Sequence, residues 1–205
     1  MDREVALPIV ERDARALRVG DVLHVTGRLF TARDQAHRLM LGLHRRGERL
    51  PFDPARSAVF HCGPLVRRGR TGYDVLAAGP TTSGRMEKMQ AAFLEAFRPG
   101  LVIGKGGMGE RTQDALRSVG AAYAHFTGGA GALAAERIVG VADVFWLEEL
   151  GSPEAVWLLD VKRFGPLHVT MDSIGGNLYR DVGRDVAARR EEILARIDGT
   201  PAGEP

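Results

Sequence analysis

The chain has little of several features that define common classes of protein. Its 205 residues include one cysteine, Cys62, which excludes disulfide frameworks, four-cysteine zinc sites and any cluster held by several cysteines of this chain. No apolar run approaches the roughly 18 residues that a membrane helix needs. The first 20 residues carry too many charges for a secretory signal. We therefore expect a cytoplasmic protein that has no contact with a membrane.

An excess of charge of one sign is also missing. Lys and Arg number 28 and Asp and Glu number 26, which leaves a formal charge of +2, and most arginines alternate with acids. Nucleic-acid-binding proteins instead gather basic residues on one face, so we do not expect a nucleic-acid partner. Apolar residues make up 44% and charged residues 26% of the chain, as in ordinary globular domains.

Apolar periodicity divides the chain into alternating strands and helices. Short apolar or alternating runs predict strands over 21–28, 57–63, 73–79, 101–107 and 121–126, and a pair of strands over 155–172 that turns at Gly165-Pro166. Apolar residues at helical spacing predict helices over 32–46, from Met86 to Phe97, and over 110–119, 128–138 and 182–197. Thr31 is expected to cap the first helix. The repeated order of strand, glycine-rich loop and helix predicts an α/β domain with mixed sheets and flanking helices.

The ends of the chain differ from its middle. Residues 1–17 are predicted to form an N-terminal extension, 18–180 the main domain, and 181–205 a C-terminal helix with a loose tail, since IDGTPAGEP has turn formers and no apolar periodicity. Within the main domain, Cys62 is expected to be a small buried hydrophobe and Trp146 and Trp157 to be core residues. Four histidines show no metal-ligand spacing and are expected to lie at the surface or to be satisfied structural residues: His44, His61, His125 and His168.

Three loops between a strand and a helix concentrate chemically useful groups. The first is TARDQAH, in which Arg33 and His37 are four residues apart and can share a helix face, with Asp34 in the first turn. The alternative for this segment is a solvated first turn in which Asp34 complements the helix dipole.

The second loop, GPTTSGRM, runs from Gly79 to Met86. It offers hydroxyls at Thr81 and Thr82, free backbone N–H groups at a helix start, and Arg85, which could bind a carboxylate in a bidentate manner. The alternative is a plain helix N-cap by Thr82 or Ser83.

The third loop, IGKGGMGE, places Lys105 among glycines after a buried strand. It is not a phosphate-binding P-loop, because Gly106 rather than Ser or Thr follows the lysine. It matches G-x-G-x-x-G spacing without a convincing acidic partner, which is a weak signal. Arg33, Arg85 and Lys105 are thus three cations at strand-to-helix junctions, where open α/β sheets bind ligands, and two or three cations suit a small dianion.

These loops, in this order, closely resemble the C-terminal domain of class I fumarases and the beta subunit of L(+)-tartrate dehydratase. The resemblance covers about residues 18–180, and the segments that carry it are GDVLHVTGRLFTARDQAH, GPLVRRGR, AGPTTSGRM, IGKGGM, GGAGAL, ELGSPEAVW and VKRFGPLHVTMDSIGGNLY. It implies a swivelling β/β/α domain. It also implies a partner, since in this family a [4Fe–4S] cluster is held by three cysteines of another domain or of an alpha subunit.

The resemblance further implies roles for site residues. Arg33 and Arg85 match carboxylate-binding arginines, Thr81 a substrate-contacting hydroxyl, Thr82 the proton-transfer residue and Lys105 a catalytic lysine of the substrate site. Asp34 and His37 match as supporting residues. The implied reaction is the reversible hydration or dehydration of a C4 dicarboxylate, fumarate to malate or tartrate to oxaloacetate, by a hydro-lyase in which the partner's iron acts as a Lewis acid.

Two other functions remain open from the sequence. One is a stand-alone module that binds a dicarboxylate or another anion without catalysis, and the other is a nucleotide-binding domain that uses the glycine-rich loops. The choice between fumarate and tartrate also stays open, because both place two carboxylates at a similar separation. An αβ pair or an α2β2 assembly is expected, with its interface at apolar surface that the isolated chain leaves bare.

Overall fold

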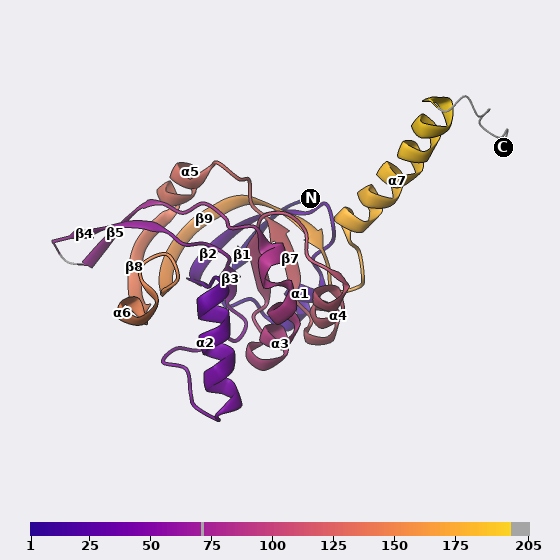
Figure 1. Cartoon of the computed structure of the whole chain (residues 1–205). Coiled ribbons are helices and arrows are strands. Elements are labelled where there is room, and N and C mark those ends of the chain that lie inside the picture. The colour runs from indigo at the N-terminus through magenta and orange to yellow at the C-terminus, as the bar shows by residue number, and fades with distance from the viewer. Residues whose placement is uncertain (71, 198–205) are drawn as a thin grey trace.

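The computed structural model describes residues 1–70 and 72–197 (Figure 1). Its strands are β1 (Asp2–Ala6), β2 (Val22–Thr31), β3 (Ala58–Phe60), β4 (Leu65–Gly69), β5 (Gly72–Ala77), β6 (Leu101–Gly104), β7 (Ala122–His125), β8 (Ile138–Phe145) and β9 (Val156–Met171). Its helices are α1 (Glu11–Arg15), α2 (Asp34–Arg45), α3 (Glu87–Phe97), α4 (Glu110–Val119), α5 (Gly131–Glu136), α6 (Leu147–Leu150) and α7 (Leu178–Ile197), with a 3-10 turn over Ser83–Met86. The predicted mixture of helices with mixed sheets is confirmed.

The main sheet closes on itself. Its strand order is β1-β2-β3-β6-β7-β9-β8, and an additional pairing joins β2 to β9. Strands β2, β3, β6, β7 and β9 therefore form a ring, with parallel pairs from β2 to β7 and antiparallel pairs wherever β9 takes part. Ring closure leaves free sheet edges only at β1, β8 and the separate β4-β5 hairpin among the described strands.

Strand residues alternate between the inside of the ring and the helices outside it. Ala58 and Phe60 of β3 belong to the inner core, whereas Val59 between them belongs to the outer core. The outer core also contains apolar residues of α2, α3 and α4, which cover one side of the sheet in Figure 1. Because β2, β3 and β6 pair in parallel, their carboxyl ends lie at the same edge of the sheet.

Strand β9 corrects the prediction of two strands that turn at Gly165-Pro166. The chain does not reverse there, because both halves of β9 pair with the same neighbour, from Val22 opposite His168 to Phe30 opposite Leu158. The register shifts where Val25 lies opposite Phe164, so the Gly-Pro step is accommodated as an irregularity within one long strand. A side chain at Gly165 would come within 2.4 Å of the Leu23 carbonyl oxygen, so glycine permits this close approach.

The prediction that Thr31 caps α2 is also wrong. Thr31 lies in β2, fully buried, and its hydroxyl donates to the Ala155 carbonyl oxygen at 3.3 Å. The residue before α2 is Arg33, which makes no side-chain cap. Cys62 and Trp157 are buried as expected, whereas Trp146 is only half-buried.

The first and last elements extend the description of the ends. Strand β1 pairs in parallel with β2, and Ile9, Ala14 and Leu17 are part of the inner core. Helix α7 leaves the body beyond β9 and projects away from it (Figure 1), with no buried residue along its 20 residues. The division into extension, domain and tail stays a prediction, and positions 198–205 of the predicted tail lie outside the described residues. No described helix is long and apolar enough to cross a membrane.

Candidate active site

An ion pair joins the first and second loops. Oδ2 of Asp34, in the first turn of α2, lies 2.7 Å from Nη2 of Arg85 in the 3-10 turn. The carboxylate is 14% exposed and the guanidinium side chain 50%, so the arginine keeps an open face while the acid restricts its position. Because the ion pair with Asp34 lies at one nitrogen of the guanidinium, the other nitrogens stay available to a carboxylate ligand.

Arg33 is held by a residue that the sequence did not single out, Glu154. Its Nε lies 3.3 Å from Glu154 Oε1, and the other carboxylate oxygen accepts a hydrogen bond of 2.9 Å from the Gln35 backbone N–H. Glu154 therefore caps the N-terminus of α2 and also orients Arg33. Gly63 leaves room for this arginine, since a Cβ there would lie 2.7 Å from Arg33 Nη1.

The second and third loops are joined through their backbones. Thr82 and Lys105 form an isolated parallel bridge, and the Ser83 N–H donates to the Lys105 carbonyl oxygen at 2.9 Å. In return the Lys105 N–H donates to Ser83 Oγ at 3.2 Å. The Thr81 N–H donates to the His61 carbonyl oxygen at 2.7 Å, which fixes the start of this loop at the end of β3.

Lys105 is half-buried and differs from the two arginines in its partners. Its side chain lies against the GGAGAL segment, where a Cβ on Gly128 would approach Lys105 Cδ to 2.9 Å. Over residues 1–70 and 72–197, both arginines have a carboxylate within 4 Å, whereas no ion pair of Lys105 is found. Glu154 and Asp34 thus offset the charges of Arg33 and Arg85, whereas no such partner offsets Lys105 among the described residues.

His37 is fully buried one turn into α2. Its Nδ1 donates to the Arg33 carbonyl oxygen at 2.8 Å, and its Nε2 lies 3.2 Å from Gln90 Oε1. Burial lowers the pKa of His37 to about 4 against the smaller opposite effect of these hydrogen bonds, so the ring is neutral at pH 7. His37 therefore supports the backbone of Arg33 and adds no charge to the loops.

The base of α7 packs against the third loop. The Tyr179 ring occupies the space above Gly107, where a Cβ would lie 2.7 Å from the ring. Its hydroxyl forms a hydrogen bond of 2.9 Å with His125 Nδ1. Burial, followed by His168 and Lys105, lowers the pKa of His125, so this histidine is also uncharged at neutral pH.

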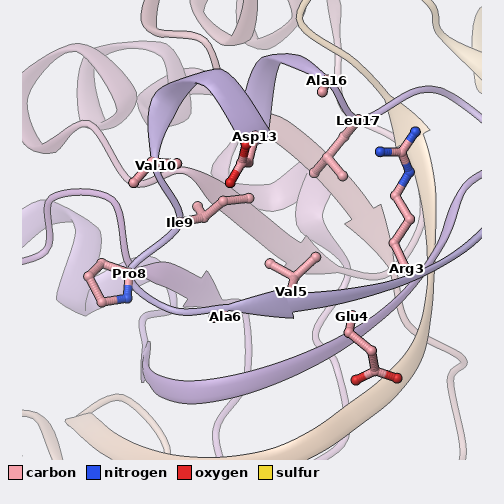
Figure 2. A pocket seen from close by; sticks show the side chains of 10 residues that line it. All are labelled: Arg3, Glu4, Val5, Ala6, Pro8, Ile9, Val10, Asp13, Ala16 and Leu17. Carbon is pink, nitrogen blue, oxygen red and sulfur yellow. The ribbon is translucent and has the colours of Figure 1, made fainter.

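A hollow elsewhere on the molecule has a different character. It measures about 520 Å³ and lies between β1 and α1, with Arg3 and Asp13 at its rim and Val5, Ile9 and Leu17 along its wall (Figure 2). None of its lining residues belongs to the three loops. It combines one cation with two carboxylates, Glu4 and Asp13, and with apolar side chains, which does not suit a small dianion.

Comparison with known proteins identifies the family. The family described as "Fumarase C-terminus" matches residues 2–182. The chain belongs to the fumarase C-terminus family. It is 39% identical over 197 residues to "L(+)-tartrate dehydratase subunit beta" of Escherichia coli K12, which covers 96% of both chains. It is 40% identical over 176 residues to "Putative fumarate hydratase class I" of Geobacillus stearothermophilus, which covers 85% of this chain and 33% of that protein.

The loops of this fumarase C-terminus chain adjoin one another as a site at strand ends requires. Arg85 contacts Asp34 from the first loop, and Thr82 and Ser83 contact Lys105 from the third. Sequence reasoning missed Glu154, although it lies in the ELGSPEAVW segment of the resemblance. It also gave no role to the buried Gln90 and Tyr123, because their patterns are those of ordinary strand and helix residues. His61 and Ser83 were named only as a structural residue and a possible helix cap. The catalytic and binding roles of the predicted residues stay predictions.

Proposed function

We propose that the chain is the beta subunit of a [4Fe–4S]-dependent hydro-lyase that reversibly hydrates or dehydrates a C4 dicarboxylate. The observation that carries the proposal is the contact between the three loops, which brings Arg33, Arg85 and Lys105 to one end of the ring of strands. The names of the relatives, tartrate dehydratase and fumarate hydratase, support this reaction class.

The cluster itself does not fit the residues of this chain. Cys62 is the one cysteine, it is buried, and burial raises the pKa of its thiol above the usual range, which disfavours the thiolate that binds iron. The described residues contain no group of three or more His, Cys, Asp or Glu that could hold a metal. We therefore assign the cluster to an alpha subunit, in an αβ or α2β2 assembly.

The charges at the loops also favour a substrate site that is shared with a cluster-bearing alpha subunit. Arg33 and Arg85 are already paired with carboxylates, so a dicarboxylate with two negative charges favours a further source of positive charge that faces the site. A metal centre on the partner would supply it. The two subunits then share one substrate, which explains why this chain offers open loops.

In this proposal the residues of the chain bind the substrate and move one proton. Arg33 and Arg85 hold the carboxylates, with Thr81 as a further contact. Thr82 exchanges the proton on the carbon next to a carboxylate, and Lys105 stabilises the negative charge that develops when that proton leaves. In dehydration the hydroxyl leaves the neighbouring carbon as water. A threonine hydroxyl is a poor base, so the role of Thr82 depends on the nearby cation.

The exposed apolar face of α7 is the surface that we assign to the alpha subunit. Val182, Val186 and Ile193 lie along this face, and each is at least half exposed. Tyr179, in the first turn of the helix, packs against the loop of Lys105, so a partner that covers the site also reaches α7. Exposed apolar surface of this kind is typical of an interface.

Co-expression with a candidate alpha subunit under anaerobic conditions tests the proposal. The complex should hydrate or dehydrate at least one of fumarate, mesaconate and tartrate, and either chain alone should be inactive. Hydro-lyase activity of this chain purified alone without iron would overturn the assignment. Saturable dicarboxylate binding by this chain, with an inactive complex, would instead support the stand-alone anion-binding module.

A further inference from the structure

A network of buried polar side chains lies beneath the three loops. His37 of α2, Gln90 of α3, His61 after β3 and Ser83 of the 3-10 turn are all fully buried, and Tyr123 of β7 joins them. The His37 and His61 ring centres lie 5.3 Å apart. Burial of a polar group costs free energy unless its donors and acceptors are paired, so the hydrogen positions in this network can be deduced.

The deduction starts at His37. Its Nδ1 faces the Arg33 carbonyl oxygen, which can only accept, so Nδ1 carries the hydrogen. In the neutral ring Nε2 is then a bare acceptor, yet it faces Gln90 Oε1, a second acceptor, at 3.2 Å. Exchanging the amide oxygen and nitrogen of Gln90 turns this contact into a hydrogen bond in which the amide donates to His37.

The same exchange resolves the neighbouring contacts. Gln90 Nε2 and His61 Nε2 both lack a hydrogen-bond partner in the original orientation, although the two side chains are adjacent. With the amide oxygen turned toward His61, its Nε2 carries the hydrogen and donates to Gln90. His61 Nδ1 is then bare and accepts from the Ser83 hydroxyl at 2.9 Å.

Ser83 connects this arrangement of hydrogen bonds to the loops of Thr82 and Lys105. With its hydrogen directed to His61, Ser83 Oγ accepts from the Lys105 N–H at 3.2 Å and shares the Tyr123 hydroxyl hydrogen, at 2.9 Å, with the Gly106 carbonyl oxygen. The position of Ser83 is fixed sterically as well, since a Cβ on Gly104 would lie 1.9 Å from Oγ. Thr82 precedes Ser83 directly, so both proposed catalytic residues are attached to it.

We propose that Gln90 is a positioning residue which, by fixing opposite tautomers of His37 and His61, orients Ser83 and so places Thr82 and Lys105. The effect on catalysis rests on the proposed function, whereas the tautomers do not. Gln90 touches neither substrate nor reacting atoms. Among the buried polar side chains described above, its amide can donate to one histidine while it accepts from the other.

Imidazole ¹⁵N NMR of the full chain at pH 7 tests the tautomers directly. We expect His37 as the Nδ1–H form and His61 as the Nε2–H form. Gln90→Met, which keeps the length of the side chain without its amide, should remove the fixed tautomer of His61. The Nδ1–H form of His61 in the unsubstituted chain would overturn the proposal, whatever reaction the complex catalyses.

Gln113→Met is the matched control. Gln113 is also a buried glutamine on a helix of the outer layer. It donates to the Asp172 carbonyl oxygen at 2.8 Å and does not belong to the network of His37, Gln90, His61 and Ser83. In the complex with the alpha subunit, Gln90→Met should lower kcat at least tenfold and change KM less than threefold, whereas Gln113→Met should change neither by more than threefold. Equal losses of kcat in the two variants would reduce Gln90 to a packing role.

Ser83→Ala gives a second route if Gln90→Met does not fold. It removes one oxygen and leaves Thr82 and Lys105 intact, so a tenfold or larger loss of kcat at near-constant KM is expected. Unchanged kcat in Ser83→Ala would contradict the proposed path through Ser83. A complex that lacks hydro-lyase activity with fumarate, mesaconate and tartrate would refute the proposed function. The NMR result would still decide the tautomers of His37 and His61.

Discussion

Thr82 has an exposed side chain on a fixed backbone. Its neighbour Ser83 exchanges two hydrogen bonds with the Lys105 backbone, so the hydroxyl of Thr82 points from a constrained position toward solvent or substrate. A hydroxyl in such a place costs no burial energy. No described hydrogen bond depends on the Thr82 hydroxyl, so its removal should leave the fold intact.

Replacement of Thr82 separates proton transfer from binding. Thr82→Ala in the assembled enzyme should lower kcat by about a hundredfold or more, the range that general acid–base groups contribute, with KM within about threefold. Steady-state kinetics on the active dicarboxylate measures this. Thr82→Ser keeps the hydroxyl and should retain most turnover, so comparable losses in the two variants would argue against the proton-transfer role.

His37 should make stability depend on pH. Its pKa in the folded chain is about 4, below the usual value of 6.5, so the unfolded chain binds the extra proton first as the pH falls. The stability contributed by the neutral ring is complete above pH 6.5 and decreases toward pH 4. Between pH 7 and pH 5 this residue alone should cost about 2 kcal/mol of unfolding free energy. Denaturant unfolding at the two pH values checks this, and equal stabilities would refute it.

At the level of elements, Glu87 connects α3 to the start of α4. Its carboxylate accepts hydrogen bonds from the Gly109 N–H and the Thr112 hydroxyl, both at 2.7 Å. No residue caps α4 with its own side chain at the N-cap position, so Glu87 replaces a local cap. The loop of Lys105 is therefore anchored at its far end by α3.

Loss of this cap should destabilise the chain measurably. Glu87→Ala should lower the unfolding free energy by about 1–2 kcal/mol, the usual cost of an N-cap. The neighbouring Lys88 is exposed, and Lys88→Ala should stay within about 0.5 kcal/mol. Chemical denaturation of both variants gives the comparison, and equal effects would show that Glu87 is not a cap.

The elements that the sequence predicted are those with strong apolar periodicity. Strands β2 and β6 and helices α2, α3 and α4 were found because they carry buried apolar residues at strand or helix spacing. Strand β5 was found from its sequence pattern alone, although none of its residues is buried. Strands β1, β4 and β8 were missed, since they lie at sheet edges and carry mostly exposed or half-buried residues. The two-strand reading of 155–172 failed because Gly-Pro is a turn signal, and only the pairing with β2 shows that the chain continues straight.

For the whole molecule, the order of the loops was predictable but their electrostatic partners were not. Arg33, Arg85 and Lys105 stand in recognisable segments, whereas Glu154 reaches Arg33 through a fold that brings the start of β9 beside α2. A local sequence pattern gives no information about a contact between residues so far apart in the sequence. The same holds for Gln90, whose position facing two histidines follows from the packing of α3 on the sheet.

Helix α7 gives a prediction for assembly. The double variant Val186→Asp/Ile193→Asp should fold as stably as the original chain, because both side chains are exposed, but should bind the alpha subunit at least tenfold more weakly. Arg184→Ala and Asp185→Ala, at exposed positions between the apolar residues, serve as controls with little expected effect. Titration of the purified subunits measures this, and undiminished affinity would place the interface elsewhere.

The closure of β2 against β9 also determines when the chain can fold. The two strands of the closing pair are separated by β3 to β8, so a ribosome has to deliver residue 171 before the last seam of the ring can form. Until then β2 and β7 each expose a backbone edge that only β9 can cover. A nascent chain stalled at residue 155 would therefore remain sensitive to protease and prone to pair with other chains, however complete its helices are.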